Sequence, residues 1–311
     1  MMGYIRRLLS FFIAPKTIDL KLNAKDKMIL AHSAISGMRL NSPNFINLWD
    51  AEVSIYSQWG EDGILTYLLD SIGIVKPKIV EIGAGNFEEC NSRFQAEFRN
   101  ASVYAIDARK DLISNCDSLE VFWKTNITPI CMMVTPDNIN EQLECAKNIM
   151  NGIDVLSLDV DGNDYWILNK AKLNDISIAI CEYNPIFGFQ NKLTIPRDDY
   201  FSRSSKHYSW LFYGMSLKAC ISEMRSKGFE FSGTNLVGNN AFFVRSDLMG
   251  KLGIPAPDIH SLQKFTDWRV RESRDKNGKL TYLAGIDRLK LIKELEVYDI
   301  EKSALKKLSN Y

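Results

Sequence analysis

The sequence predicts an α/β protein with a doubly wound central sheet that is covered by helices on both faces. Segments of β character alternate with segments of helical periodicity through the middle of the chain. This alternation is typical of parallel sheets whose strands are joined by crossover helices. Four of the five expected parallel strands are apolar on both faces, as strands buried between two helical layers should be.

These elements follow one another in order along the chain. The strands are predicted at residues 78–83, 102–107, 129–134, 154–160 and 176–183. The helices beside or between them are predicted at residues 62–73, 91–99, 137–150 and 214–227. No internal repeat or long linker divides this region, so one α/β domain is expected at residues 51–250.

After the fifth strand the pattern changes to an antiparallel hairpin. Residues 228–245 contain two β-rich runs, and the turn at residues 235–240 holds one glycine and three asparagines. Five parallel strands followed by a hairpin give a seven-stranded sheet. Nicotinamide-dependent dehydrogenases end instead in a sixth parallel strand, so the pattern argues against that class.

Helical extensions are expected at both ends, over residues 1–50 and 251–311. In the first, a basic pair precedes the apolar run Leu8 to Ala14, which is too short to span a membrane. Residues 1–14 fit either an interfacial helix at the inner membrane face or a helix docked on the domain. The tail from Ile286 to Leu308 is predicted to form a charged amphipathic helix packed on the domain or on a partner subunit.

The composition excludes several classes of protein. Hydrophobic residues make up 46% of the chain and aromatic residues 11%, which indicates a globular protein. The 38 basic residues balance the 38 acidic ones, so no overall field favours a nucleic-acid partner. The six cysteines include no C-x-x-C pair, which favours reduced thiols in a cytoplasmic protein.

A glycine-rich loop follows the first predicted strand. In VEIGAGN (residues 80–86), Glu81 lies on the strand and Gly83, Ala84 and Gly85 form a tight turn whose glycines let backbone approach a ligand closely. A dinucleotide fingerprint would have a third glycine where Glu88 stands. Turn glycines without a ligand are the alternative interpretation.

An aspartate ends the second predicted strand. Asp107 lies 22 residues beyond Gly85, and a carboxylate at that place can accept hydrogen bonds from both hydroxyls of a ribose. The alternative is a strand-end aspartate that caps the next helix.

Together the strand pattern and these residues resemble the class I S-adenosylmethionine-dependent methyltransferases, which have a Rossmann-like fold. That resemblance implies that Glu81, Gly83, Ala84 and Gly85 contact the methionine portion of the cofactor and that Asp107 binds its ribose. Gln58, together with Glu61 and Asp62, precedes the first strand and is expected either to cover the cofactor or to cap a helix.

A narrower resemblance is carried by five segments between residues 50 and 250. They are similar to a bacterial FkbM-like group of methyltransferases associated with surface-polysaccharide genes, and they read YSQWGEDGIL (56–65), ECNS (89–92), SLDVDGNDYW (157–166), CEYNPIFG (181–188) and GTNLVGNNAFFVR (233–245). The likeness implies methyl transfer, as O-methylation, to a small molecule or a sugar or polysaccharide precursor.

Oxygen-bearing side chains gather where the fourth and fifth strands end. Asp159 and Asp161 follow the fourth strand, and Glu182 and Asn184 follow the fifth. In this fold that edge lies beside the methionine end of the cofactor, so Asp159 or Glu182 is the candidate base or acceptor-orienting group.

Two other interpretations of these side chains remain open. Asp159, Asp161, Asn163 and Glu182 are hard oxygen ligands suited to a divalent cation such as Mg²⁺ or Mn²⁺. Alternatively, residues 161–164 provide turn and N-cap chemistry for the helix that begins near Tyr165.

Rival functions use the same motif. A D-x-D sequence after a hydrophobic strand also describes metal-dependent glycosyltransferases, although that class leaves Glu81, the G-x-G loop and Asp107 unexplained. Haloacid-dehalogenase phosphatases place a similar loop on the first strand with Ser or Thr where Asn163 stands, which argues against them. A non-catalytic binding protein on the methyltransferase scaffold is a third class.

Histidine and aromatic residues supply further candidates. His207 lies beyond the fifth strand, where acceptor-binding loops are expected, and is either a catalytic base or a packing residue. Trp59, Tyr165 and Trp166 can stack on a sugar ring or belong to the core.

Overall fold

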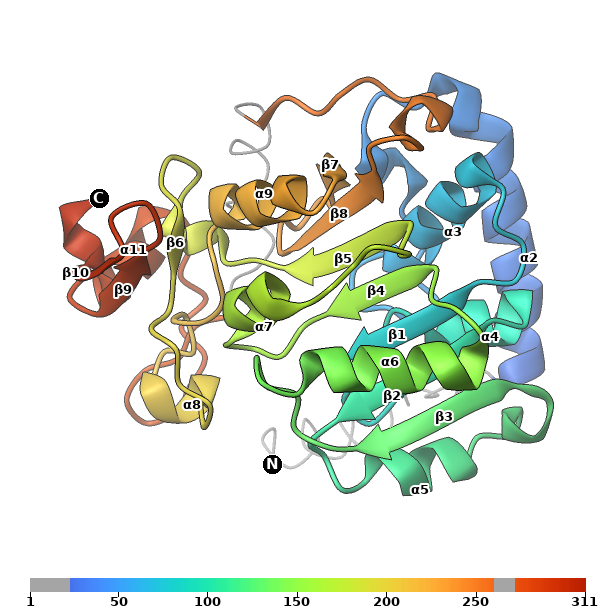
Figure 1. Cartoon of the computed structure of the whole chain (residues 1–311), viewed down its shortest axis with the longest axis horizontal. Coiled ribbons are helices and arrows are strands. Elements are labelled where there is room, and N and C mark those ends of the chain that lie inside the picture. The colour runs from blue at the N-terminus through green and yellow to red at the C-terminus, as the bar shows by residue number, and fades with distance from the viewer. Residues whose placement is uncertain (1–22, 260–271) are drawn as a thin grey trace, which may run out of the picture.

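A seven-stranded sheet forms the centre of the computed structural model, which describes residues 23–259 and 272–311 (Figure 1). Its strand order is β3-β2-β1-β4-β5-β8-β7. The strands are β1 Lys78–Ile82, β2 Ser102–Asp107, β3 Asn126–Cys131, β4 Val155–Leu158, β5 Ile178–Glu182, β7 Phe229–Thr234 and β8 Asn240–Arg245. Strands β1 to β5 are parallel, and β8 is antiparallel to both β5 and β7, which confirms the predicted sheet.

Helices cover both faces of this sheet (Figure 1). One layer consists of α2 Ala24–Asn41, α3 Glu61–Ile72, α4 Arg93–Arg99 and α5 Leu112–Asp117, and the other of α6 Ile139–Met150, α7 Asp164–Lys170 and α9 Leu217–Ser226. The short helices are η1 Ser42–Asn44, η2 Leu48–Ala51, η3 Phe122–Lys124, η4 Pro185–Phe187, α8 Arg203–Lys206, η5 Met249–Lys251, α11 Ile286–Ile292 and η6 Leu308–Asn310.

The two layers pack on opposite sides of the same strands. On β1, Ile79 packs in the cluster with Leu65 of α3, while Val80 packs in the other cluster with Ile139 of α6. Burying a side chain of this kind contributes about 1.5–3 kcal/mol, so the doubly buried strands are the most strongly held part of the sheet. They fix the positions from which the loops at the carboxyl edge begin.

Among the predicted boundaries that differ from the structure, two have a clear physical reason. The third strand covers residues 126–131 rather than 129–134, because its pairing with β2 places Cys131 opposite Asp107 and Met132 beyond the ladder. Helix α4 begins at Arg93 rather than residue 91, since the backbone N–H groups of Asn91 and Ser92 donate to the Glu81 carboxylate instead.

The predicted C-terminal helix over Ile286 to Leu308 was wrong beyond its first seven residues. Only α11 is helical, and the chain then forms β9 Glu296–Asp299 and β10 Ala304–Lys307. Strand β9 pairs with β10 and with β6 Leu193–Thr194, which extends the sheet region at the carboxyl edge of the main strands (Figure 1). Burial of Val297 against Leu193 favours this pairing over helix propensity.

Some predictions concern residues outside the described ranges. The interfacial or docked helix at residues 1–14 lies there, and the three-region division of the chain stays a prediction. Among the described residues, none of the helices has both the length and the apolar character needed to cross a lipid bilayer.

Two helical glycines predict opposite effects of the same substitution. At Gly63 in α3, a Cβ atom would lie 2.1 Å from the carbonyl oxygen of Ala51 and 2.4 Å from the amide nitrogen of Val53. Gly63→Ala should therefore lower the free energy of unfolding by about 3 kcal/mol. At Gly37 in α2 a Cβ meets nothing within 4 Å, so Gly37→Ala should raise it by up to about 1 kcal/mol. Chemical denaturation measures both, and equal effects would contradict the packing described.

Candidate active site

The strand order reverses at β1, and the loops that follow the strands there enclose the candidate site. Strand β1 lies between β2 and β4. The chain therefore runs from β1 to β2 on one side of it and later adds β4 on the other side. Ligands of doubly wound sheets bind in the crevice that such a reversal opens at the carboxyl ends of the strands. Two adjoining cavities of about 410 Å³ and 340 Å³ lie there, and Gly83, Asp159 and Asp161 line both.

The two loop glycines serve different purposes. Gly83 has a φ of +87°, and a Cβ atom on it would lie 1.5 Å from the carbonyl oxygen of Asp159. Only glycine permits this approach of the β1 and β4 loops. Gly85 has a φ of +58°, and a Cβ there would meet nothing within 4 Å because it would project into open space at the larger cavity.

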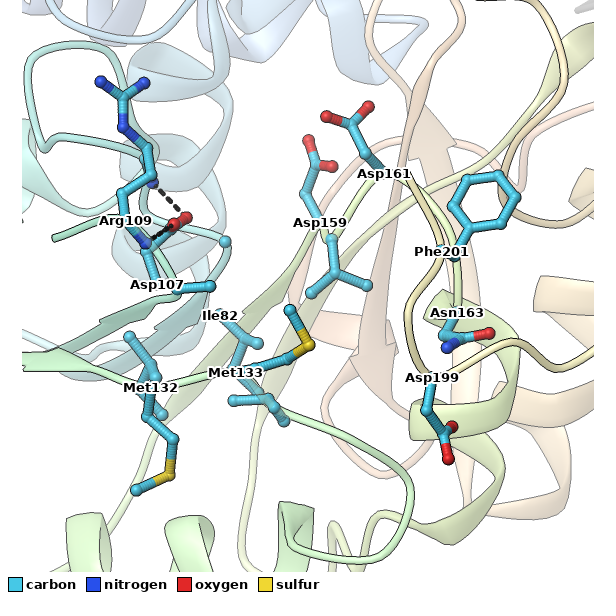
Figure 2. Close-up of a pocket in the computed structure, with 16 residues that line it drawn as sticks. Ile82, Asp107, Arg109, Met132, Met133, Asp159, Asp161, Asn163, Asp199 and Phe201 are labelled. Carbon is cyan, nitrogen blue, oxygen red and sulfur yellow. Dashed lines mark hydrogen bonds between the residues drawn. The ribbon is translucent and has the colours of Figure 1, made fainter. Parts of the chain in front are cut away.

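Asp107 stands in the larger cavity as predicted (Figure 2). One carboxylate oxygen accepts a hydrogen bond from the Gly85 N–H at 2.8 Å, and the other accepts one from the Arg109 N–H at 2.8 Å. These bonds hold the carboxylate at the cavity wall. Each oxygen keeps a lone pair that can accept a ligand hydroxyl.

The larger cavity has an apolar wall next to this carboxylate. Met132, Met133 and Val134 follow β3 and line it, and the side chains of Met132 and Met133 are 39% and 50% exposed. In Figure 2 Met132 lies below Asp107, and Met133 lies nearer to Asp159. Flexible, polarizable methionine side chains adapt to a flat aromatic ligand.

Glu81 lines the smaller cavity and holds the start of α4 in place. Its buried carboxylate accepts hydrogen bonds from the N–H groups of Asn91 at 2.7 Å and Ser92 at 2.9 Å, and from the Ser92 hydroxyl. Burial raises the pKa of this carboxyl, and these donors partly oppose the rise. Glu81 therefore fixes the start of α4 and lines the cavity with its remaining surface.

A second glutamate joins the loop before α3 to the β7–β8 turn. Glu61 accepts hydrogen bonds from the Trp59 N–H at 3.0 Å and from the side-chain amides of Asn235 at 2.7 Å and Asn240 at 2.8 Å. This contact holds Gln58 and Trp59 at the rim, and both line the smaller cavity.

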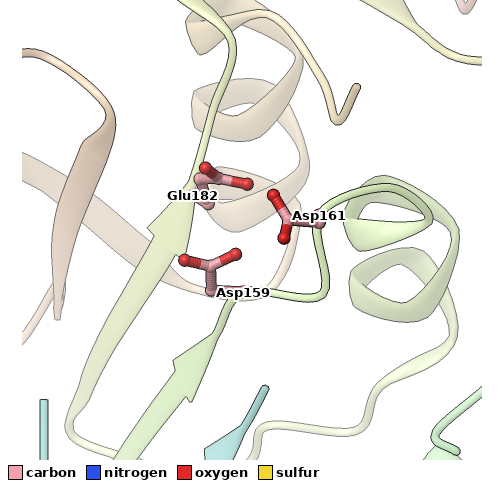
Figure 3. A group of neighbouring side chains, drawn as sticks. All are labelled: Asp159, Asp161 and Glu182. Carbon is pink, nitrogen blue, oxygen red and sulfur yellow. The ribbon is translucent and has the colours of Figure 1, made fainter. Parts of the chain in front are cut away.

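Three carboxylates meet where the two cavities join (Figure 3). Oxygen atoms of Asp159, Asp161 and Glu182 lie within 4.8 Å of one another. Arg203 approaches from the connection between β5 and α9, and its Nη1 lies 2.9 Å from Asp161 Oδ1. The guanidinium carbon also lies 3.9 Å from the centre of the Tyr213 ring, a cation–π contact.

Burial and mutual repulsion raise the pKa values of two of these carboxyls. For Asp159 the main cause is desolvation, followed by the charges of Asp161 and Asp164. For Glu182 the main cause is again desolvation, followed by the charge of Asp159. Glu182 is 5% exposed, and its Oε2 has no hydrogen-bond partner among the described residues. Its charge is therefore poorly compensated in the free protein.

The neighbouring residues take the structural role. Asp164 accepts hydrogen bonds from the N–H groups of Val160 at 2.8 Å and Gly162 at 2.9 Å, which is the predicted turn chemistry at the start of α7. Asn163, a predicted cation ligand, lines the larger cavity, where its side-chain amide donates to the Asp198 carbonyl and its Oδ1 accepts from the Asp198 N–H. Of the acidic residues in this loop, Asp159 and Asp161 therefore remain as the candidate functional ones.

Other candidates lie elsewhere. His207 lines neither cavity, and its Nδ1 lies 2.7 Å from Ser209 Oγ. Ala84 is fully buried beneath the glycine loop. Trp166 donates from Nε1 to the Ile195 carbonyl and packs edge-on against Tyr165, so these two rings belong to the core side. Asn184 is buried and donates to the carbonyl groups of Leu211 and Tyr213.

Sequence reasoning missed several lining residues. Met132 and Met133 were assigned to a strand, and Arg203 and Tyr213 fall in a connection of irregular structure that has no periodic pattern. Asn239 and Asn240 were interpreted only as turn residues, yet both line the smaller cavity. The one sequence signal that could have pointed to Arg203 is a basic residue in the connection after the fifth strand.

Comparisons with known proteins give distant likenesses. No family model matches the chain, and no curated protein matches its sequence. The N-terminal domain of EvdMO1 with SAH bound is 9% identical, with a TM-score of 0.38 over 59% of this chain and 79% of that one. An S-adenosylmethionine-dependent methyltransferase from Clostridium acetobutylicum is 10% identical, with a TM-score of 0.37 over 70% and 97%.

A third likeness is to the 1,6-didemethyltoxoflavin-N1-methyltransferase of Burkholderia thailandensis. It is 11% identical, with a TM-score of 0.30 over 73% of this chain and 91% of that one. The strand order of the present chain is that of the Rossmann-like methyltransferase fold. Its function has to be inferred from the residues of its own cleft.

Two glutamates at the site predict opposite responses to loss of charge. Glu182 has a raised pKa and an unpaired oxygen, so Glu182→Gln should raise the free energy of unfolding by about 1 kcal/mol at neutral pH. The gain should vanish below the pKa of an unfolded glutamate, where both states of the wild type are protonated. Glu81→Gln should instead lower stability by about 1–3 kcal/mol, because an amide NH₂ would face a backbone N–H. Denaturation at several pH values measures both, and destabilisation by Glu182→Gln would show that its charge is compensated.

Proposed function

We propose that the protein is an S-adenosylmethionine-dependent methyltransferase that holds the adenosine half of the cofactor in the larger cavity, and its methionine half and the acceptor in the smaller. The main support for this proposal is that the two cavities share lining residues. Asp159 and Asp161 border both cavities, so a group bound in one lies next to a group bound in the other. Methyl transfer is an in-line displacement that depends mainly on such orientation.

The residues of the larger cavity fit the adenosine half of the cofactor. Asp107 offers two oxygen acceptors for the ribose hydroxyls, and Met132 and Met133 offer an apolar wall for the base. Gly85 leaves the wall beside Asp107 open. The methionine half would lie over Gly83 toward Gln58 and above Glu81, at the smaller cavity.

The cofactor, when bound, supplies a methyl group on a positively charged sulfur. Asp159 faces the junction of the cavities, and its raised pKa suits it to accept a proton from an acceptor hydroxyl near neutral pH. The hydroxyl oxygen then forms its bond to the methyl carbon, and the electron pair of the broken bond stays on sulfur. Glu182 assists by orienting the acceptor. We propose O-methylation of a small molecule or of a sugar or polysaccharide precursor.

A divalent cation at Asp159, Asp161 and Glu182 is the second candidate for this chemistry. The proximity of their oxygens favours it. Arg203 weighs against it, because its guanidinium already neutralises part of the charge of Asp161. A D-x-D glycosyltransferase would need this cation to bind a nucleotide diphosphate, and the remaining acidic lining of the smaller cavity repels phosphate.

Cofactor binding tests the proposal at Asp107. The wild type should bind S-adenosylhomocysteine, and Asp107→Ala should weaken binding by about 1–3 kcal/mol because the ribose loses a charged acceptor. Gly85→Val should abolish binding by filling the cavity wall. Isothermal calorimetry measures the affinities. Asp117→Ala is the matched control, since Asp117 is exposed and lines neither cavity. A folded wild type without affinity would refute the proposal.

Catalysis tests the role of Asp159. With an accepted substrate, Asp159→Asn should keep the affinity for S-adenosylhomocysteine and lower kcat by about 10²–10⁴. Because the base must be deprotonated and its pKa is raised, wild-type activity should fall as the pH is lowered from the alkaline side. Chelators should change little. A stoichiometric cation in the purified wild type that is lost in Asp159→Asn would favour the metal mechanism instead.

A further inference from the structure

The smaller cavity is strongly acidic. Among the described residues that line it, seven carry a carboxylate: Glu61, Glu81, Glu89, Asp159, Asp161, Glu182 and Glu272. The same described lining has one side chain that is always cationic, Arg203. Hydrogen bonds from neighbouring donors already satisfy Glu61 and Glu81, so the uncompensated charge lies chiefly at the Asp159, Asp161 and Glu182 cluster.

The arginine of this cavity is already engaged. Its Nη1 donates to Asp161 Oδ1 at 2.9 Å, its Nε donates to the Trp210 carbonyl, and its plane lies against Tyr213. A phosphate or carboxylate on an acceptor would have to break these contacts and would still face the surrounding carboxylates. The cavity therefore disfavours an anionic acceptor.

One carboxylate oxygen of Glu182 lacks a donor among the described residues. Glu182 is buried at the junction of β5 with the cavity, and the oxygen without a partner is its Oε2. Figure 3 shows the side chain directed toward Asp159 and Asp161. An ionised carboxylate only accepts hydrogen bonds, and an ionised aspartate beside Glu182 adds to the negative charge instead of compensating it.

An ammonium group matches both the charge and the spacing. Its three donors diverge tetrahedrally, so at about 2.8 Å from each acceptor it spans oxygen separations of up to about 4.6 Å. The three carboxylates offer oxygens within 4.8 Å of one another. The same oxygens could also hold a divalent cation, but Arg203, whose guanidinium pairs with Asp161, weighs against one.

We propose that Asp159, Asp161 and Glu182 bind an ammonium group and that the methyl acceptor supplies it, an inference that rests on the proposed function. The acceptor then carries an amino group close to the hydroxyl that receives the methyl. The rest of the cavity suits a sugar ring, because Trp59 offers an aromatic face and Asn239 and Asn240 belong to the same lining.

The amino group of the cofactor's own methionine is the other source of the same chemistry. The glycine loop that would hold the methionine follows β1, whereas Glu182 ends β5, two strands away. Adjacent strands lie about 4.8 Å apart, so Glu182 is about 9.5 Å from β1 across the sheet. Asp159 lies close to the glycine loop, so the affinities measured below have to distinguish the two sources.

The test uses glucosamine and N-acetylglucosamine as probes on the full-length protein saturated with S-adenosylhomocysteine at near-neutral pH. Calorimetry should show that glucosamine binds about 10- to 100-fold more tightly, the range expected of hydrogen bonds to a charged group. Glu182→Gln should remove the difference. Glu89→Gln makes the same change in the same cavity but outside the cluster, and should keep it.

Equal affinities for the two probes, or no affinity for glucosamine, would overturn the inference. If Glu182→Gln instead weakens S-adenosylhomocysteine about 10-fold while the probes do not differ, the ammonium belongs to the cofactor and the acceptor assignment is wrong. Stoichiometric binding of Mg²⁺ or Mn²⁺ that Glu182→Gln abolishes would also overturn it. Failure of S-adenosylhomocysteine to bind the wild type is a separate result and contradicts the proposed function itself.

Discussion

The close contact between the loops after β1 and β4 is the constraint on which the site depends. Gly83 lies so near the carbonyl of Asp159 that no side chain fits between them. The contact places the Asp159 and Asp161 carboxylates at the boundary of both cavities. Without it, a ligand on the glycine loop and a ligand near β5 would not meet. The doubly buried strands on either side hold this geometry in place.

The carboxylate cluster shows how such a site is maintained at a cost to stability. Desolvation raises the pKa values of Asp159 and Glu182, so their charged forms destabilise the free protein at neutral pH. Burial raises the pKa values of Asp164 and Glu81 as well, and the hydrogen bonds that these two carboxyls accept at the starts of α7 and α4 limit the cost there. A cationic or hydrogen-bond-donating ligand relieves the remaining repulsion. The charge of the cleft therefore favours such ligands even without specific contacts.

Periodicity and end-of-strand motifs predicted much of this arrangement. The five parallel strands, the hairpin and the placement of Asp107, Asp159 and Glu182 at one edge follow from apolar runs that end in acidic residues, because parallel strands bring their carboxyl ends together. Features that depend on long-range pairing were not predictable in this way. Strand β9 forms by pairing with β6 and by burying Val297 in the cluster that contains Leu193, and Arg203 of α8 reaches Asp161 across 42 residues of sequence. Local patterns also could not show that Asn163 turns toward Asp198.

The most direct measurement of the central claim is a crystal structure of the protein with S-adenosylhomocysteine. In that structure the adenine should lie against Met132 and Met133, and the ribose hydroxyls should donate to the Asp107 carboxylate. The sulfur should point toward Asp159 at the junction of the two cavities. Bound S-adenosylhomocysteine at any other place, or an empty cleft in crystals grown with saturating ligand, would contradict it.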